Sequence, residues 1–111
     1  MNEFAQKHCI PCEGNMPPLT SREAAKLLKD VVGWEPNENT TIIRRIFKFK
    51  NFKEAMVFTN AVGEIAETEG HHPDLIVKWG SVEILLSTHS IKGLSENDFI
   101  LAAKIDEIPV K

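Results

Sequence analysis

The sequence lacks any apolar run of the roughly 20 residues that a membrane helix requires. Its N-terminus also lacks the charged segment followed by an apolar segment that marks a secretion signal. The formal net charge of −3 leaves no basic excess of the kind that nucleic-acid binding requires. We therefore expect no membrane partner, no nucleic-acid partner and a cytoplasmic location. The 111 residues suffice for one domain, and with 42% hydrophobic residues its core needs no disulfide.

Cysteine is scarce: Cys9 and Cys12 are the only two, in the segment His-Cys-Ile-Pro-Cys at positions 8–12. In the haem attachment motif the histidine follows the second cysteine, whereas here it precedes the first. A zinc site would need a second pair of ligands, and a thioredoxin-type site would need a strand followed by a helix. We interpret residues 1–19 as an irregular, loose N-terminal arm, with a metal or redox role of the cysteines as the alternative. Residues 20–111 form the predicted domain.

Three helices are predicted from one shared start signal, a capping side chain three residues before a carboxylate. The pairs are Thr20 and Glu23, Asn51 and Glu54, and Ser95 and Asp98. The first helix should end near residue 32, the second should span about 52–68, and the third about 97–107. In the second, the stripe expected to face the core is Phe52, Ala55, Met56, Thr59, Val62, Gly63 and Ala66.

Strands are predicted between these helices from alternating side chains. They are expected at about 34–35, 40–49, 75–79 and 81–89, with Gly80 in a hairpin between the last two. The order α-β-β-α-β-β-α predicts an α+β fold, in which helices pack on one face of a four-stranded antiparallel sheet. The opposite face also carries apolar groups, so we expect another copy of the chain to cover part of it.

The densest group of chemically competent side chains is a histidine cluster. Three of the four histidines, His71, His72 and His89, fall within nineteen residues. Imidazole can donate and accept protons near neutral pH. Each histidine alone would more often be a surface or helix-end residue, but together they favour a site. Pro73 restricts His72 to extended geometry, in which neighbouring side chains point to opposite sides. The two imidazoles would therefore converge poorly on one ion, and could instead line two sides of a pocket for a flat ligand.

Two carboxylates accompany the histidines. Glu67 lies four residues before His71 in the last turn of the second helix, where a negative charge is unfavourable for the helix dipole. That cost is a hint that Glu67 serves the site. Asp98 can cap the third helix at Ser95, or it can orient His89 or hold a ligand N–H, and the sequence leaves these interpretations open.

At these residues the chain resembles the pterin-4a-carbinolamine dehydratase family over about residues 17–105. The most specific part is His71-His72-Pro73-Asp74-Leu75 with His89 and Asp98 at their spacing. The other matching segments are Pro17-Pro18-Leu19, Val32-Gly33-Trp34, Arg45-Ile46-Phe47-Lys48-Phe49, Phe52, Ala66-Glu67, Val82-Glu83-Ile84, Thr88, Gly93-Leu94-Ser95 and Leu101-Ala102.

The resemblance implies a hydro-lyase without a metal or other cofactor. Such an enzyme dehydrates 4a-hydroxytetrahydropterin to quinonoid dihydropterin, which recycles the tetrahydropterin of aromatic amino-acid hydroxylases. Members of the family form dimers through sheet edges, and some form tetramers through helices. The implied partners of this chain are therefore a small pterin substrate and further copies of itself, in a homodimer or a homotetramer.

The resemblance also implies a set of site residues. His71, His72 and His89 are the implied catalytic groups. The residues implied to bind the substrate are Glu67, Gly70, Pro73, Ser87, Thr88 and Asp98. Some relatives carry an acidic residue where this chain has Gly70, so one pterin contact would be missing or supplied otherwise. Our hypothesis makes His71 the acid at the departing hydroxyl and His89 the second acid–base group, while His72 and Glu67 position the ring.

Two other functions compete with the dehydratase interpretation. One is a metal-dependent hydrolase that uses the three histidines as ligands. The other is a non-catalytic dimerisation or regulatory module on the same scaffold. Metal analysis together with chelation separates the first from a dehydratase, and a direct dehydration assay separates the second.

Overall fold

A computed structural model describes residues 3–10 and 16–109 of the chain. Its elements are the 3₁₀ helix η1 (Glu3–Gln6), helix α1 (Ser21–Leu28), strands β1 (Glu35–Pro36) and β2 (Ile43–Lys48), helix α2 (Phe52–Glu69), strands β3 (Asp74–Lys78) and β4 (Ser81–Leu86), the 3₁₀ helix η2 (His89–Ile91) and helix α3 (Glu96–Asp106). The strands form one sheet in the order β1-β2-β4-β3, and every pair is antiparallel. The predicted α+β fold is confirmed.

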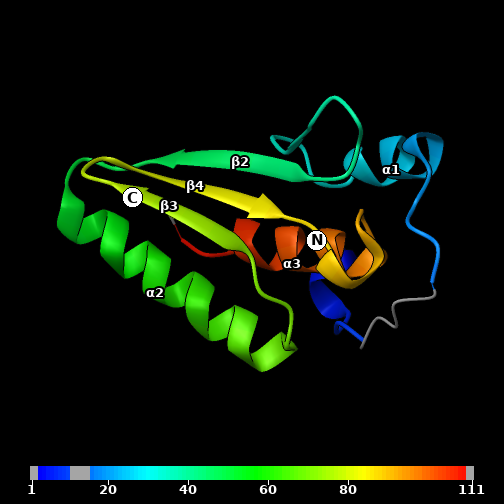
Figure 1. Ribbon diagram of the computed structural model, residues 1–111. Helices are drawn as coiled ribbons and strands as arrows, with labels where there is room; N and C mark the ends of the chain where they lie inside the picture. The colour runs from blue at the N-terminus through cyan, green and yellow to red at the C-terminus, as the bar shows by residue number, and fades with distance from the viewer. Residues whose placement is uncertain (1–2, 11–15, 110–111) are drawn as a thin grey trace.

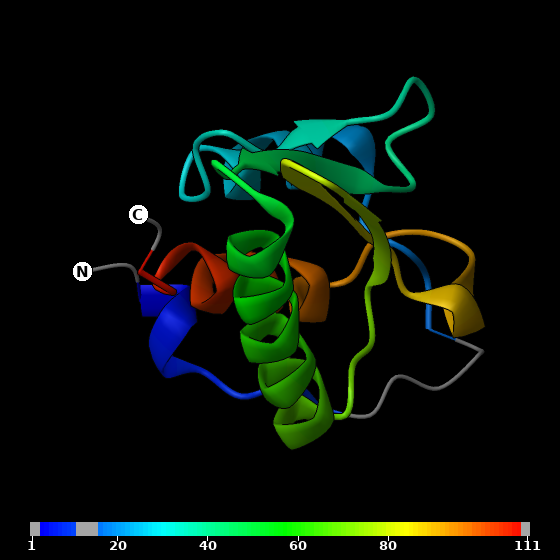
Figure 2. The same cartoon turned by 90° about the vertical axis from the view of Figure 1, so that its left-hand side faces the viewer.

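The core lies between the sheet and the two longer helices. Figure 1 shows α2 and α3 on the same side of the sheet, and Figure 2 shows α2 running along it. The buried face alternates along β4, where Val82, Ile84 and Leu86 are fully buried. On the partner strand β2, Ile43 and Phe47 are buried beside them. This alternation follows from the two-residue period of a strand with one face toward the core.

The helix starts agree with the capping signals, while one helix end does not. Thr20 caps α1 in a reciprocal arrangement with Glu23, and Asn51 accepts from the Glu54 N–H at the start of α2. Helix α1 ends at Leu28 instead of near residue 32. Beyond it the backbone continues in tighter turns, because the N–H groups of residues 30 and 31 each bond the carbonyl three residues earlier.

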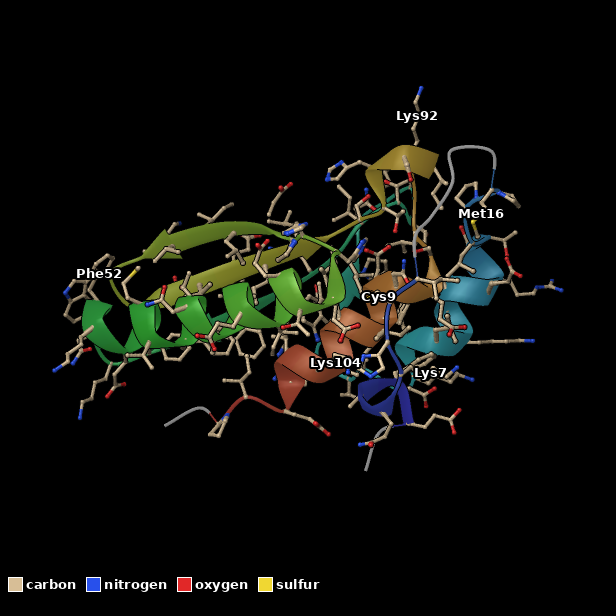
Figure 3. The ribbon with its side chains drawn as sticks, turned by 90° about the horizontal axis from the view of Figure 1, so that it is seen from below. Lys7, Cys9, Met16, Phe52, Lys92 and Lys104 are labelled. Carbon is tan, nitrogen blue, oxygen red and sulfur yellow. The ribbon has the colours of Figure 1, made fainter. Side chains whose placement is uncertain are left out.

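The N-terminal arm differs from the loose segment that we expected. Residues 3–6 form a turn of 3₁₀ helix, and the side chains of Phe4 and Ala5 are buried against the core. The Lys104 ammonium on α3 donates to the Ala5 carbonyl oxygen at 2.9 Å. Figure 3 shows the arm along α3, with Lys104 and Cys9 labelled. Burial of Phe4, which no local pattern signals, explains the difference. Cys12 lies outside the described residues.

The other face of the sheet is open. Ile46 and Ile76 flank Glu83 across three neighbouring strands, and their side chains are 43% and 45% exposed. Coverage of this face by a second copy of the chain stays a prediction. Within residues 3–10 and 16–109, no helix is both long enough and apolar enough to span a membrane.

Candidate active site

A cavity of about 460 Å³ opens where the end of α2, the end of β4, the helix η2 and the N-terminal arm meet. Its lining is mostly polar side chains that come from segments far apart in the sequence. The lining residues are Cys9, Ile10, Glu69, Gly70, His71, His72, Ser87, Thr88, His89, Ser90 and Asn97. All three histidines of the predicted cluster therefore face one cavity.

Gly70 places the histidine pair at this cavity. It ends α2 in the left-handed conformation, with φ of 68°, and its N–H bonds the Ala66 carbonyl at 2.9 Å. A non-glycine residue would be strained there. A Cβ at Gly70 would meet no atom of the described residues within 4 Å. The space beside Gly70, where a side chain would stand, is therefore open.

His71 is held by a buried carboxylate. Its Nε2 lies 2.6 Å from Asp98 Oδ1, and the two side chains are 12% and 0% exposed. The other oxygen, Asp98 Oδ2, accepts from the Thr88 hydroxyl at 2.8 Å and from the Ser95 N–H at 3.0 Å. Each Asp98 oxygen is therefore satisfied, as burial of a carboxylate requires.

This geometry answers the question that the sequence left open for Asp98. One oxygen caps α3 at Ser95 while the other orients a histidine, so the carboxylate does both at once. The histidine is His71, however, and not His89 as one interpretation had it. Asp98 is fully buried behind His71 and does not line the cavity.

The buried carboxylate also selects a tautomer of His71. A carboxylate only accepts, so we infer that Nε2 of His71 carries a proton and donates it to Asp98. The remaining nitrogen, Nδ1, is then the atom that can exchange a proton with a ligand. A fixed tautomer with one free nitrogen is the arrangement that a histidine acid or base needs.

His72 forms a similar pair in a different environment. Its Nε2 lies 2.5 Å from Glu67 Oε2, but the side chains are 61% and 79% exposed. Water competes for both partners of an exposed pair, so the pair contributes little to stability and its geometry is weakly enforced. Glu67 contacts the site through His72 and is not among the cavity residues.

The other predicted residues lie at the cavity or just outside it. Strand β4 ends at Leu86 and His89 begins η2, because the backbone of Thr88 pairs with Gly93 and closes a short loop. His89 was expected in the strand, and in the loop it is exposed at the cavity. Ser87 also lines the cavity, and its hydroxyl donates to the Thr41 carbonyl oxygen at 3.0 Å. Pro73 follows the histidine pair but does not line the cavity.

Sequence reasoning missed the contribution of the arm and of α3. Cys9, Ile10 and Asn97 line the cavity, and none of them belongs to the predicted site. The Cys9 N–H and the Ile10 N–H bond Glu69 and Asn97, which are 60 and 87 positions away. No local periodicity or motif signals contacts of that sequence separation.

No cluster of three or more His, Cys, Asp or Glu side chains in the described part of the chain is arranged to hold a metal ion. The two histidine–carboxylate pairs instead join one imidazole to one carboxylate each.

Comparison with known sequences gives a family. Residues 17–108 match the family described as "Pterin 4 alpha carbinolamine dehydratase". The chain belongs to this family. A relative from Methylococcus capsulatus is 52% identical over 92% of this chain and 90% of its own length. One from Rubrobacter xylanophilus is 47% identical over 97% and 100% of the two chains. The names of both assign them provisionally as pterin-4-alpha-carbinolamine dehydratases.

Solved structures agree with the family fold. A transcriptional coactivator/pterin dehydratase from Brucella melitensis superposes with a TM-score of 0.76 at 34% identity, covering 80% of this chain and 95% of its own. A pterin dehydratase-like protein described as a RuBisCO assembly factor in the alpha-carboxysome superposes with a TM-score of 0.58 at 23% identity, covering 67% and 86%. The second likeness shows the fold alone.

Proposed function

We propose that this protein dehydrates 4a-hydroxytetrahydropterin to quinonoid dihydropterin, so that tetrahydropterin can be recycled for an aromatic amino-acid hydroxylase. The observation that carries the proposal is the gathering of His71, His72 and His89 around one cavity, with His71 held by the buried Asp98. Family membership supports a pterin as the ligand. The cavity of about 460 Å³ lies in the size range of small-molecule sites.

The reaction needs two proton transfers and no nucleophile. An acid protonates the 4a-hydroxyl, the C4a–O bond breaks as the N5 lone pair forms the C4a=N5 bond, and water leaves. A base then takes the N5 proton, which gives neutral quinonoid dihydropterin. Each positioned acid or base contributes about 10²- to 10⁴-fold in rate.

The histidines suit these two steps differently. In the proposal His71 enters the reaction as the imidazolium: Asp98 holds the proton on Nε2, and a second proton on Nδ1 is donated to the departing hydroxyl. His89 takes the proton from N5, because it lies at the same cavity on the separate element η2. His72, paired with Glu67, positions the ring. After one turnover His71 has lost a proton and His89 has gained one, and exchange with solvent water returns both histidines to their starting states.

A stopped-flow assay of 4a-carbinolamine decay tests the function directly. Wild-type protein should accelerate the decay well above the buffer rate, and a chelator should leave the rate unchanged. Decay at the buffer rate would contradict the proposal and favour a non-catalytic module. Loss of the activity on chelation would favour the metal-dependent hydrolase type of site.

A further inference from the structure

The N-terminal arm reaches the cavity although it precedes the residues that match the family. Cys9 and Ile10 line the cavity on the side of α3, and Figure 3 shows Cys9 where the arm passes this helix. We propose that the arm is a wall of the pterin site, in which Ile10 contacts the bound ring while Asn97 and Glu69 are positioning residues that hold the arm. This inference rests on the function proposed above, because it takes a pterin as the ligand.

Asn97 holds Ile10 by both ends of its amide. Its Oδ1 accepts from the Ile10 N–H at 3.0 Å, and its Nδ2 donates to the Ile10 carbonyl at 2.5 Å. The Asn97 side chain belongs to a buried residue, which is 4% exposed. A paired, buried amide fixes the backbone of Ile10 as a strand partner would, because both backbone polar groups are satisfied.

Glu69 holds the preceding residue. Its Oε1 accepts from the Cys9 N–H at 2.7 Å, and its Oε2 lies 2.9 Å from Nδ1 of His8 and 3.8 Å from the Lys104 ammonium. Burial alone would raise the pKa of Glu69. The Cys9 N–H, His8 and Lys104 outweigh it and hold the pKa below its ordinary value. The carboxylate is therefore ionised at neutral pH, where it can hold the arm.

The two positioning residues are close neighbours of the catalytic pair in the sequence. Glu69 stands two positions before His71, and Asn97 stands next to Asp98. The same two segments that carry the His71–Asp98 pair therefore carry the contacts that hold the arm. The positions of the arm, His71 and Asp98 are therefore fixed relative to one another, so a ring that lies against Ile10 has a defined position relative to His71.

Ile10 offers an exposed apolar surface against which a flat ring could pack. It is an apolar side chain that remains 64% exposed at the lining of an otherwise largely polar cavity. An apolar surface of this kind gains free energy when a ligand covers it. The Ile10 side chain is apolar and cannot transfer a proton, so the contribution of the arm should appear in substrate binding and not in the chemical step.

The experiment measures KM and kcat for dehydration in Ile10→Ala, Asn97→Ala and the double variant. Each single variant should raise KM about fivefold while kcat stays within about twofold, since partial loss of a buried apolar contact is worth that factor. The double variant should be no worse than Asn97→Ala, because Ile10 is already displaced when Asn97 is gone. Binding of 7,8-dihydrobiopterin, measured by titration calorimetry, should weaken by the same factors.

Two variants serve as matched controls. Asn60→Ala makes the same change on an exposed position of α2, and Val32→Ala trims an apolar side chain that is 81% exposed. Both should leave KM unchanged. Thermal unfolding is recorded for every variant. Ile10→Ala removes an exposed side chain and should keep the wild-type Tm even where Asn97→Ala does not.

The outcomes separate the two proposals. If wild-type protein dehydrates the substrate but Ile10→Ala leaves KM and dihydrobiopterin affinity unchanged, the proposal that the arm forms a wall of the site is wrong. The proposed function would still stand. Additive effects in the double variant would likewise contradict a shared role of Asn97 and Ile10. If wild-type protein neither converts the substrate nor binds dihydrobiopterin, the proposed function is wrong, and so is the proposal about the arm, which depends on it.

Discussion

This protein has two neighbouring histidine–carboxylate pairs, and they differ in how deeply they are buried. His71 and Asp98 are 12% and 0% exposed, whereas His72 and Glu67 are 61% and 79% exposed, although the histidines are adjacent in sequence. The contact distances are similar, at 2.6 and 2.5 Å. Distance alone therefore does not distinguish them. The buried carboxylate is fixed by Thr88 and Ser95 and imposes one geometry on its histidine, while the exposed pair competes with water.

The largest effect should follow from removing the buried imidazole. His71→Ala is expected to lower kcat by about 10²- to 10⁴-fold, because it removes the group proposed as the acid at the departing hydroxyl. Asp98 keeps its bonds from Thr88 and Ser95, so the fold should survive. Stopped-flow dehydration and thermal unfolding measure the two quantities. An activity within twofold of wild type would show that His71 is not the acid.

Asp98→Asn tests the carboxylate of the same pair. The amide cannot accept from His71, Thr88 and Ser95 in the same way, so the tautomer of His71 is released. We expect kcat to fall about 10- to 100-fold, as when the group orienting an imidazole is removed. A buried donor left unpaired should also lower the free energy of unfolding by about 1–3 kcal/mol. Kinetics and denaturant unfolding check both, and wild-type kcat would mean that Asp98 only caps α3.

His72→Ala removes the exposed imidazole. An exposed pair contributes about 1 kcal/mol or less, which corresponds to about a fivefold change at 1.4 kcal/mol per tenfold. The change should appear in KM, since the proposed role is to position the ring. Steady-state kinetics gives the answer, and a loss of kcat as large as in His71→Ala would erase the distinction between the pairs.

Glu67→Gln should have the smallest effect. The amide keeps the size of the side chain and removes a charge that is already largely solvated, so both KM and kcat should change by about twofold or less. Side by side with Asp98→Asn, it makes the same acid-to-amide change at the exposed pair. Equal losses in the two variants would mean that burial has no bearing on function.

The sequence allowed much of the fold to be predicted because its signals are local. The capping side chains of Thr20 and Asn51 fix helix starts, and Gly70 fixes the end of α2. Phe58 was missed as a core residue, although its ring packs 4.6 Å from that of Phe47. Its position lies beside the stripe that periodicity selected, where Phe52 is in fact 48% exposed. The buried residues of α2 are Ala55, Phe58, Val62 and Ala66, which also keep helical spacing. The period is therefore right, and packing against the sheet decides which face of the helix is buried.

In the site, too, local signals could be predicted from the sequence, whereas contacts that depend on tertiary packing could not. The three histidines could be predicted because loop signals flank them, with Pro73 after the pair and Gly93 closing the loop of His89. The partner of Asp98 could not, because that choice depends on how α3 packs against the end of α2. The arm could not be predicted for the same reason. Asn97 and Ile10 are brought together only by burial of Phe4 and Ala5 against the core.

The most direct measurement compares kcat at saturating substrate for His71→Ala and His72→Ala in one stopped-flow series. If a buried carboxylate makes one imidazole the proton donor, the loss at position 71 should exceed the loss at position 72 by at least about tenfold. Equal losses, or a greater loss at the solvent-exposed histidine, would contradict that account.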